Sequence, residues 1–192
     1  MTTKNVSGRP VNAQASLDLR AAALRLVREN GYERVSIAAI VKQAGVARQT
    51  LYNRWDTKAD LVLDAVLEET ESYAAAPRLD DPRPCRELLE EFLANVFDHL
   101  LVNGDVLRAL IAAAQKDAAF QEKFAARFIL PREQMITDLL RQAQTRGELS
   151  SGRDAELISG LVHGAFWYRL LNRRGLDRHF AQAIASEVFG QP

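Results

Sequence analysis

Apolar residues along this chain recur every three or four positions, which is the spacing of one face of an α-helix. Leu17, Ala21, Leu24 and Val27 follow this spacing, and Gly31 stands where a helix would end. The sequence has no sustained apolar–polar alternation and no Asn-Gly or Asp-Gly hairpin between β-branched runs, so it predicts no β-strand. The pattern therefore predicts an all-α protein whose first helix spans residues 16–30.

Shorter helices are predicted to follow before residue 73. Ser36 is suited to cap a second helix that stops at Gly45, and a third would span about residues 47–55. Thr57 and Asp60 have the spacing of a capping box, which would open a fourth helix.

Prolines and glycines divide the helical pattern in the rest of the chain. Residues 76–84 contain three prolines, which predicts a loop, with Asp81 capping the next helix and Pro82 starting it. That helix is expected to end near Gly104, and a separate helix would span residues 106–114.

Later elements are predicted from the same signals. Pro131 should break or kink the helix that contains it, and Ser151–Asp154 has the form of a second capping box. The helix over residues 157–171 is apolar on almost every face, so it must be covered on more than one side. A final helix is expected over residues 177–189.

Residues 35–55 predict a helix-turn-helix, because two short helices are joined by a turn centred on Gly45, which tolerates positive φ. The exposed face of the second helix would offer side chains able to bond base edges in the major groove: Arg48, Gln49, Thr50 and Asn53. Ser36, Tyr52 and Lys58 are suited to phosphates. Packed helix pairs with a glycine turn also occur in many proteins that bind no DNA.

The distribution of charge favours the DNA interpretation. The net charge is zero, but residues 1–58 hold ten Lys or Arg against four Asp or Glu, a balance of +6, and the remainder carries −6. A basic segment joined to an acidic one suggests contact with a polyanion, although a basic tail that aids solubility is the alternative.

The stretch Gly45–Leu61 resembles the signature of the TetR family of transcriptional regulators. Its features are Thr50-Leu51-Tyr52, an aromatic residue three positions on, and a Thr-Lys pair opening the fourth helix. The resemblance covers about residues 16–70. In it, Ala47 stands where Ser is frequent, Arg48-Gln49 where Lys-Gly is frequent, and Trp55 where Phe is usual, so no operator sequence can be carried over.

This resemblance implies a flexible tail (1–15), a helix-turn-helix DNA-binding domain (16–58) and a helical ligand-binding and dimerisation domain (59–192). By the same resemblance Ser36, Tyr52 and Lys58 would hold phosphates, and Arg48, Gln49, Thr50 and Asn53 would face bases or nearby backbone. It further implies a repressor that binds double-stranded palindromic operator DNA as a homodimer and is released by an unknown small-molecule effector.

In the family, the last long helices pair with their copies in a twofold bundle. We expect the interface to contain Gly160, Leu161, Gly164 and Tyr168, with Phe189 and the final helix as further candidates. Gly160 and Gly164 lie one turn apart and would permit a close approach of backbones. The alternative is that they accommodate a neighbouring helix of the same subunit.

Aromatic and soft apolar residues with one titratable group could form the effector pocket. They are Phe97, Phe128, Met135, His163, Phe166 and Trp167. Ordinary core is the alternative for each of them, and His163 could be a hydrogen-bonded core histidine.

Rival functions have little support in the sequence. It contains no Walker A loop, dinucleotide fingerprint, His-Glu-x-x-His or Gly-x-Ser-x-Gly motif, so neither an enzyme nor a cofactor is expected. The histidines at 99, 163 and 179 lack metal-ligand spacing, so no metal site is expected. A module that only sequesters a ligand is the remaining rival.

Cellular location is predicted from absent signals. The first fifteen residues lack an apolar region and the longest uncharged stretch, 157–168, is too short to span a bilayer, so we expect a cytoplasmic protein without membrane contact. Cys85 is the only cysteine and is expected to be a surface thiol.

Overall fold

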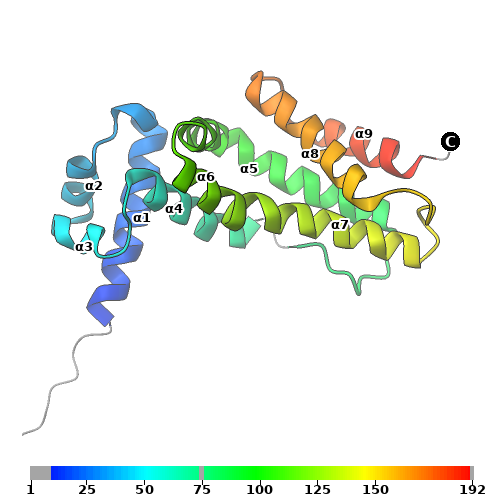
Figure 1. The fold of residues 1–192 in the computed structure, drawn as a ribbon, viewed down its shortest axis with the longest axis horizontal. Coiled ribbons are helices and arrows are strands. Elements are labelled where there is room, and N and C mark those ends of the chain that lie inside the picture. Colours follow the sequence, from blue (N-terminus) through cyan, green and yellow to red (C-terminus); the bar gives the residue numbers. More distant parts are fainter. Residues whose placement is uncertain (1–9, 74–75, 191–192) are drawn as a thin grey trace, which may run out of the picture.

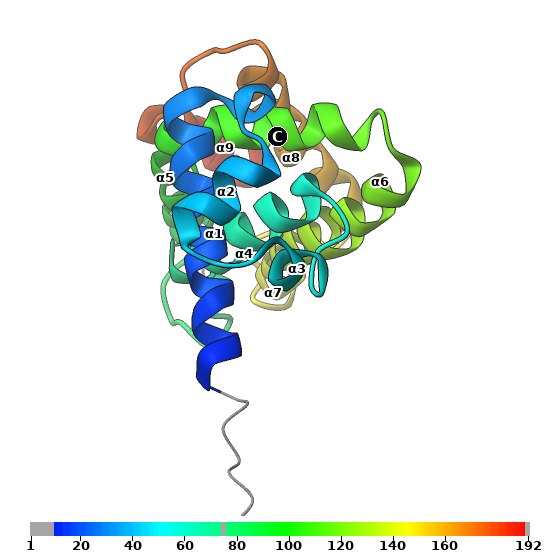
Figure 2. The same ribbon diagram turned by 90° about the vertical axis from the view of Figure 1, so that its left-hand side faces the viewer.

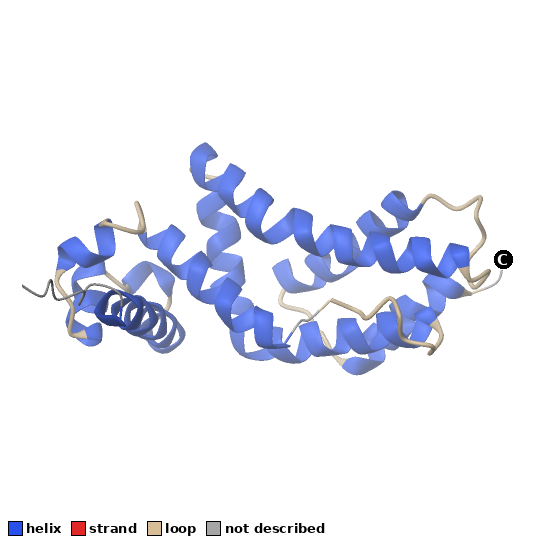
Figure 3. Ribbon diagram, turned by 90° about the horizontal axis from the view of Figure 1, so that it is seen from below, coloured by secondary structure: helices blue, strands red, loops and turns tan. Residues whose placement is uncertain are grey.

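The computed structural model describes residues 10–73 and 76–190, and within these ranges the chain forms helices and no strands. The molecule is elongated, with α2 and α3 at one end and the C-terminal part of the chain at the other (Figure 1). The view from below shows helices joined by loops along this whole length (Figure 3). The predicted all-α fold class is therefore confirmed.

The N-terminal elements are α1 (Pro10–Asn30), a 3-10 turn η1 (Tyr32–Arg34), α2 (Ile37–Ala44), α3 (Arg48–Tyr52) and α4 (Lys58–Tyr73). Helix α1 begins at Pro10, whereas the sequence placed its start at Ser16. The predicted N-cap of α2 is confirmed, because Ser36 Oγ accepts a 3.1 Å hydrogen bond from the main-chain N–H of Ala39. Figure 2 looks onto this end, where α1, α2 and α3 lie together.

The body consists of α5 (Cys85–Ala114), α6 (Ala118–Phe124), a π-helical segment η2 (Ala125–Ile129), α7 (Leu130–Thr145), α8 (Ala155–Leu171) and α9 (Arg178–Phe189). Helix α5 packs against α9 and also contacts α1, α4, α6, α7 and α8. It is the central element that joins the N-terminal helices to the body.

The predicted break in α5 is wrong, because the helix runs without interruption through Gly104. The Asn103 side chain, which could have capped a helix end, is used in tertiary contacts: it accepts a 2.8 Å bond from Arg28 Nε and donates a 3.1 Å bond to Glu69. These bonds tie α5 to α1 and α4 at the position where the sequence suggested a stop.

The predicted start of α5 is also wrong. The helix begins at Cys85, with Pro84 in the N-cap position, and not at Pro82. Asp81 does not cap it, because its carboxylate accepts a 2.9 Å bond from the main-chain N–H of Arg83 and so closes the preceding turn.

Cys85 is buried, which corrects the expectation of a surface thiol. Its main-chain N–H donates to Glu148 Oε2 at 2.5 Å, a contact 63 residues away along the chain. Burial raises the pKa of the Cys85 thiol to about 11, and the neighbouring Glu148 carboxylate adds to this effect. The thiol is therefore protonated and shielded at neutral pH.

The regular α-helix is interrupted next to Pro131, in line with the expected break or kink: α6 ends at Phe124, the chain winds as a π-helix through Ala125–Ile129, and α7 begins with Pro131 in its first turn. The second capping box is wrong, because Asp154 itself caps α8 by accepting a 3.0 Å bond from the N–H of Leu157. Asp177 caps α9 in the same way, through the N–H of Phe180 at 2.8 Å.

Candidate functional site

The turn between α2 and α3 has the geometry that the sequence predicts. Gly45 has φ 67° and closes α2 in the left-handed conformation that residues with a side chain rarely adopt. Ile40 on α2 and Leu51 on α3 are fully buried, and Trp55 is buried after the end of α3. These apolar residues fix α3 against the other N-terminal helices, so the orientation of its outer face is set by packing.

That outer face carries the predicted base-reading residues. Arg48, Gln49, Tyr52 and Asn53 are exposed, and Thr50 is half-buried. Gln49 Nε2 donates a 2.9 Å bond to Asn53 Oδ1, one turn further along the chain. Arg48 donates a 3.1 Å bond to the Tyr52 hydroxyl, with its guanidinium carbon 5.4 Å from the centre of the Tyr52 ring.

These two pairs hold amide and guanidinium groups side by side on one exposed surface. Side chains held by a neighbour lose less conformational freedom when they meet a base edge. Ser36 lies outside α3, at the start of α2, and its hydroxyl still has a hydrogen to donate to a phosphate after accepting from Ala39.

Lys58 has partners within the protein. Its ammonium donates to the carbonyl oxygens of Tyr32 at 2.6 Å and Val35 at 2.9 Å, and lies 3.9 Å from the centre of the Tyr32 ring. Burial lowers the pKa of Lys58, against the opposing effect of Glu33. An ammonium has three N–H donors, so one remains for a phosphate.

Two exposed cations of the helix-turn-helix are not among the residues predicted to contact DNA. Lys42 lies on α2 and Arg54 directly after α3, and both are exposed. The charge balance of residues 1–58 was the signal that could have identified them.

The predicted interface residues form an exposed stripe on α8. Gly160 and Gly164 are exposed, as are Leu161 and Tyr168, whose exposed fractions are 65% and 55%. A side-chain carbon added at either glycine would meet no atom within 4 Å in the described part of the chain. The alternative that these glycines admit a neighbouring helix of the same subunit is therefore contradicted. Phe189, at the end of α9, is half-buried.

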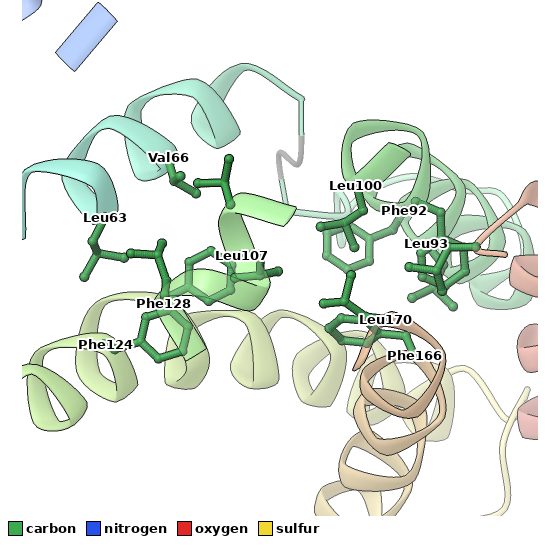
Figure 4. Close-up of a cluster of buried hydrophobic side chains, with 14 of the residues drawn as sticks. Leu63, Val66, Phe92, Leu93, Leu100, Leu107, Phe124, Phe128, Phe166 and Leu170 are labelled. Atoms are coloured by element: carbon green, nitrogen blue, oxygen red, sulfur yellow. The ribbon is translucent and has the colours of Figure 1, made fainter. Parts of the chain in front are cut away.

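Five of the six predicted pocket residues belong to one hydrophobic core or pack against it, and their ring contacts lie in different parts of that core. Phe97 stacks on Phe180 with ring centres 5.8 Å apart, and Phe166 lies 6.4 Å from Phe97 and 4.6 Å from Trp167. Phe128 instead stacks on Phe124 at 5.1 Å. Figure 4 shows Phe124 and Phe128 in one group with Leu63, Val66 and Leu107, and Phe166 in another with Phe92, Leu93, Leu100 and Leu170.

Of the remaining pocket candidates, two lie in or against the core and one lines a cavity. Met135 is half-buried against the core, and His163 is buried with Nδ1 at 2.8 Å from the carbonyl oxygen of Ser159. Trp167 lines a cavity of about 220 Å³ together with residues from α5, α6 and η2. Within the described residues there is no group of three or more His, Cys, Asp or Glu side chains placed to hold a metal ion.

Ion pairs connect α6 and η2 to the helix-turn-helix end. Lys123 Nζ lies 3.0 Å from both Asp56 and Asp60, at the start of α4. Arg127 lies 2.6 Å from Asp64, which also pairs with Arg20 of α1 at 3.2 Å. Movement of α6 or η2 would therefore act directly on α4.

Comparisons with known proteins cover both parts of the chain. Residues 19–65 match the model described as bacterial regulatory proteins, tetR family, and residues 81–188 match the Tetracyclin repressor-like, C-terminal domain. An uncharacterised HTH-type transcriptional regulator of Mycobacterium tuberculosis is 28% identical over 172 residues, which are 89% of this chain and 84% of the relative.

Solved structures give the same result for the fold. The TetR family transcription regulator SCO0332 aligns with a TM-score of 0.73 and 25% identity, over 92% of this chain and 97% of that one. FadR from Bacillus subtilis, in complex with stearoyl-CoA, aligns with a TM-score of 0.75 and 17% identity, over 91% and 97%. None of the helices in the described ranges is both long and apolar enough to cross a membrane.

Proposed function

The chain belongs to the TetR family of helix-turn-helix transcriptional regulators, and we propose that it is a ligand-responsive repressor that binds a palindromic operator as a homodimer. A small-molecule effector would release it from the DNA. The observation that carries this proposal is the outer face of α3, where two side-chain pairs are exposed on the basic segment of the chain.

Base reading is assigned to this face. Arg48, Gln49, Thr50 and Asn53 would meet base edges or nearby backbone, and Ser36, Tyr52 and Lys58 would meet phosphates. Arginine and glutamine have donor patterns that match guanine and adenine in the major groove. We assign residues 16–58 to DNA binding and residues 59–192 to effector binding and dimerisation. Of the expected tail, residues 10–15 belong to α1 and residues 1–9 lie outside the described residues.

The exposed stripe of α8 supports the homodimer. Large apolar side chains that face solvent next to two glycines mark a surface that another helix covers. We propose that a second copy of α8 covers this surface, because one recognition helix reads few base pairs and a twofold dimer reads two inverted half-sites.

Effector binding in the body is supported by the relatives. A protein of similar fold, FadR from Bacillus subtilis, binds stearoyl-CoA. In this chain the ligand would lie among the clusters that contain Phe97, Phe128, Met135, His163, Phe166 and Trp167. A cytoplasmic location follows from the proposed access to DNA.

Selection of bound sequences from a random double-stranded DNA pool tests the proposal. A repressor of this kind should enrich one inverted repeat, and light scattering should give a dimer both free and bound to that repeat. Enrichment of no sequence would favour the rival, a module that only sequesters its ligand. A monomer on DNA would contradict the homodimer.

A further inference from the structure

Arg132 on α7 places a guanidinium among neutral partners inside the body. One terminal nitrogen donates to the carbonyl oxygen of Phe128 at 2.9 Å, and the other donates to Thr70 Oγ1 on α4 at 3.0 Å. The guanidinium carbon also lies 3.7 Å from the centre of the Phe128 ring. These contacts use two of the five N–H donors of an arginine.

The contacts of Arg132 differ from those of four other arginines that join the helices. Arg20, Arg28, Arg108 and Arg127 each pair with a carboxylate. Arg132 has no carboxylate within 4.0 Å in residues 10–73 and 76–190, leaving aside the side chains that the structure does not describe. Glu69, which adjoins Thr70 on α4, is bonded to Arg28 and Asn103 instead.

Arg132 is partly buried, and partial burial of a cation without a counter-charge has an energetic cost. Burial lowers the pKa of Arg132 to about 10, and no neighbouring carboxylate opposes the shift. The nearby His99 supplies no counter-charge, because an imidazole is either neutral or cationic. Burial lowers the pKa of His99, and the charges of Arg28 and Arg132 add to this against that of Glu69. Proteins that keep an uncompensated buried charge commonly use it at a functional site.

The position of Arg132 joins the aromatic cluster to the DNA-binding end. Its acceptor Phe128 belongs to η2, and π-helical segments of this kind are frequent at functional sites. Its second acceptor, Thr70, belongs to α4, the helix that starts beside the helix-turn-helix. An anion that drew the guanidinium away from these acceptors would disturb both elements.

We propose that Arg132 recognises the anionic group of the effector, which is a molecule with a carboxylate, sulfonate or phosphate group on an apolar body. This inference rests on the proposed function, since it assigns a ligand class to the effector site. The charge would take the unused N–H donors of Arg132.

Two fluorescent probes that differ only in charge test this proposal. Anilinonaphthalene sulfonate carries a sulfonate on the ring system of the neutral phenylnaphthylamine. The parent chain should bind the sulfonate more tightly than the neutral probe. Arg132→Met should weaken sulfonate binding by about 10- to 100-fold and leave the neutral probe almost unchanged. Arg141→Gln, which removes an exposed arginine of the same helix paired with Glu156, should change neither affinity.

Stability separates recognition from a structural role. Ligand-free Arg132→Met should melt close to the parent chain, because the loss of two hydrogen bonds is offset by the removal of a partly buried cation that has only neutral partners. A lower melting temperature with equal loss of both probes would overturn the proposal. Arg132→Lys keeps the charge and should retain part of the preference for the sulfonate probe. Equal affinities of the parent chain for the two probes would also overturn the proposal.

DNA binding by the same variants keeps the two proposals distinct. If the chain binds no DNA but its affinity for the sulfonate probe still depends on Arg132, the repressor proposal is wrong and the anion-site proposal stands. If the chain binds its operator but has equal affinity for the two probes, the repressor proposal stands and the anion-site proposal is wrong.

Discussion

The Lys58 ammonium donates a 2.6 Å hydrogen bond to the main-chain carbonyl of Tyr32, so the first turn of α4 is tied to the segment that precedes α2. A second bond, to Val35, strengthens this connection. Lys58 therefore has a role in the fold in addition to the phosphate contact proposed for it.

Replacement of Lys58 by Met should show both roles. Loss of the two bonds leaves the Val35 carbonyl without this donor and the Tyr32 carbonyl with only the N–H of Val35, so the free energy of unfolding should fall by about 1–3 kcal/mol, measured by denaturant titration. Loss of one phosphate contact should lower the slope of log affinity against log salt by about one unit. Lys116→Met, an exposed substitution in the body, is the control. An unchanged slope would leave Lys58 with the structural role alone.

Arg48 is the residue we expect to read a base. Arg48→Ala should weaken operator binding by about 1–3 kcal/mol and relax the preference at one base position, because a positioned guanidinium can donate two bonds to guanine. Sequence profiles of variant and parent are compared by selection from a random pool. Should the profiles coincide, Arg48 contacts phosphate and Gln49 becomes the better candidate. Tyr52→Phe removes the hydroxyl that accepts from Arg48 and should give a smaller change at the same position.

The features that the sequence predicts well are local in the chain. The Ser36 cap, the Gly45 turn and the Thr57–Asp60 capping box each depend on groups within a few residues, so residue type and spacing are sufficient. The exposed face of α3 is predicted for the same reason, since a short helix with buried Leu51 must present the opposite residues outward.

The features that the sequence does not predict depend on distant partners. Asn103 carries α5 past its expected end through a bond to Arg28, 75 residues away. Cys85 is buried under contacts with a helix end 63 residues further on. Aromatic composition likewise could not show that Phe97 stacks on Phe180 and Phe128 on Phe124, because periodicity gives the buried face of a helix and not the neighbour that it meets.

A charge on the exposed stripe of α8 should dissociate the proposed dimer. Leu161→Glu would place two carboxylates in an apolar twofold interface, so the dimer dissociation constant should rise by about 100-fold or more, measured by sedimentation. Operator affinity should fall with it. Leu101→Glu makes the same change at another exposed leucine, on α5, and should leave the dimer intact. A dimer that tolerates Leu161→Glu would place the interface elsewhere.

Asp64 should give the fold a component of acid sensitivity. Burial alone would raise the pKa of Asp64, but bonds from Arg127, Arg20 and Trp55 outweigh it and hold the pKa below its usual value of 3.8. A carboxyl with a depressed folded-state pKa contributes stability above its unfolded pKa and loses that contribution as the pH falls through the folded value. Asp64→Asn should therefore reduce stability at neutral pH and flatten its decline below about pH 4. Parallel acid titrations of parent and variant would contradict this assignment.

Transmission of the effector signal should depend on the ion pairs that connect η2 and α6 to α4. Arg127 pairs with Asp64 at 2.6 Å and Lys123 with Asp60 at 3.0 Å, so displacement of η2 by a ligand would pull on the helix that carries Lys58. Coupling between two sites is typically about 1–3 kcal/mol and is reciprocal: effector weakens operator binding by the same factor as operator weakens effector binding.

The double substitution Lys123→Gln and Arg127→Gln should therefore reduce this coupling. Effector affinity is titrated with and without saturating operator, and the ratio of the two values gives the coupling. In the parent chain the ratio should lie between about 5 and 150. In the variant it should approach one, while the operator-free effector affinity stays close to that of the parent, because neither side chain is proposed to contact the ligand. Arg141→Gln breaks an ion pair between α7 and α8, away from α4, and should leave the ratio unchanged. A ratio that survives the double substitution would show that the signal reaches α4 by another route, through the Arg132–Thr70 bond or through apolar neighbours such as Phe124 and Phe128.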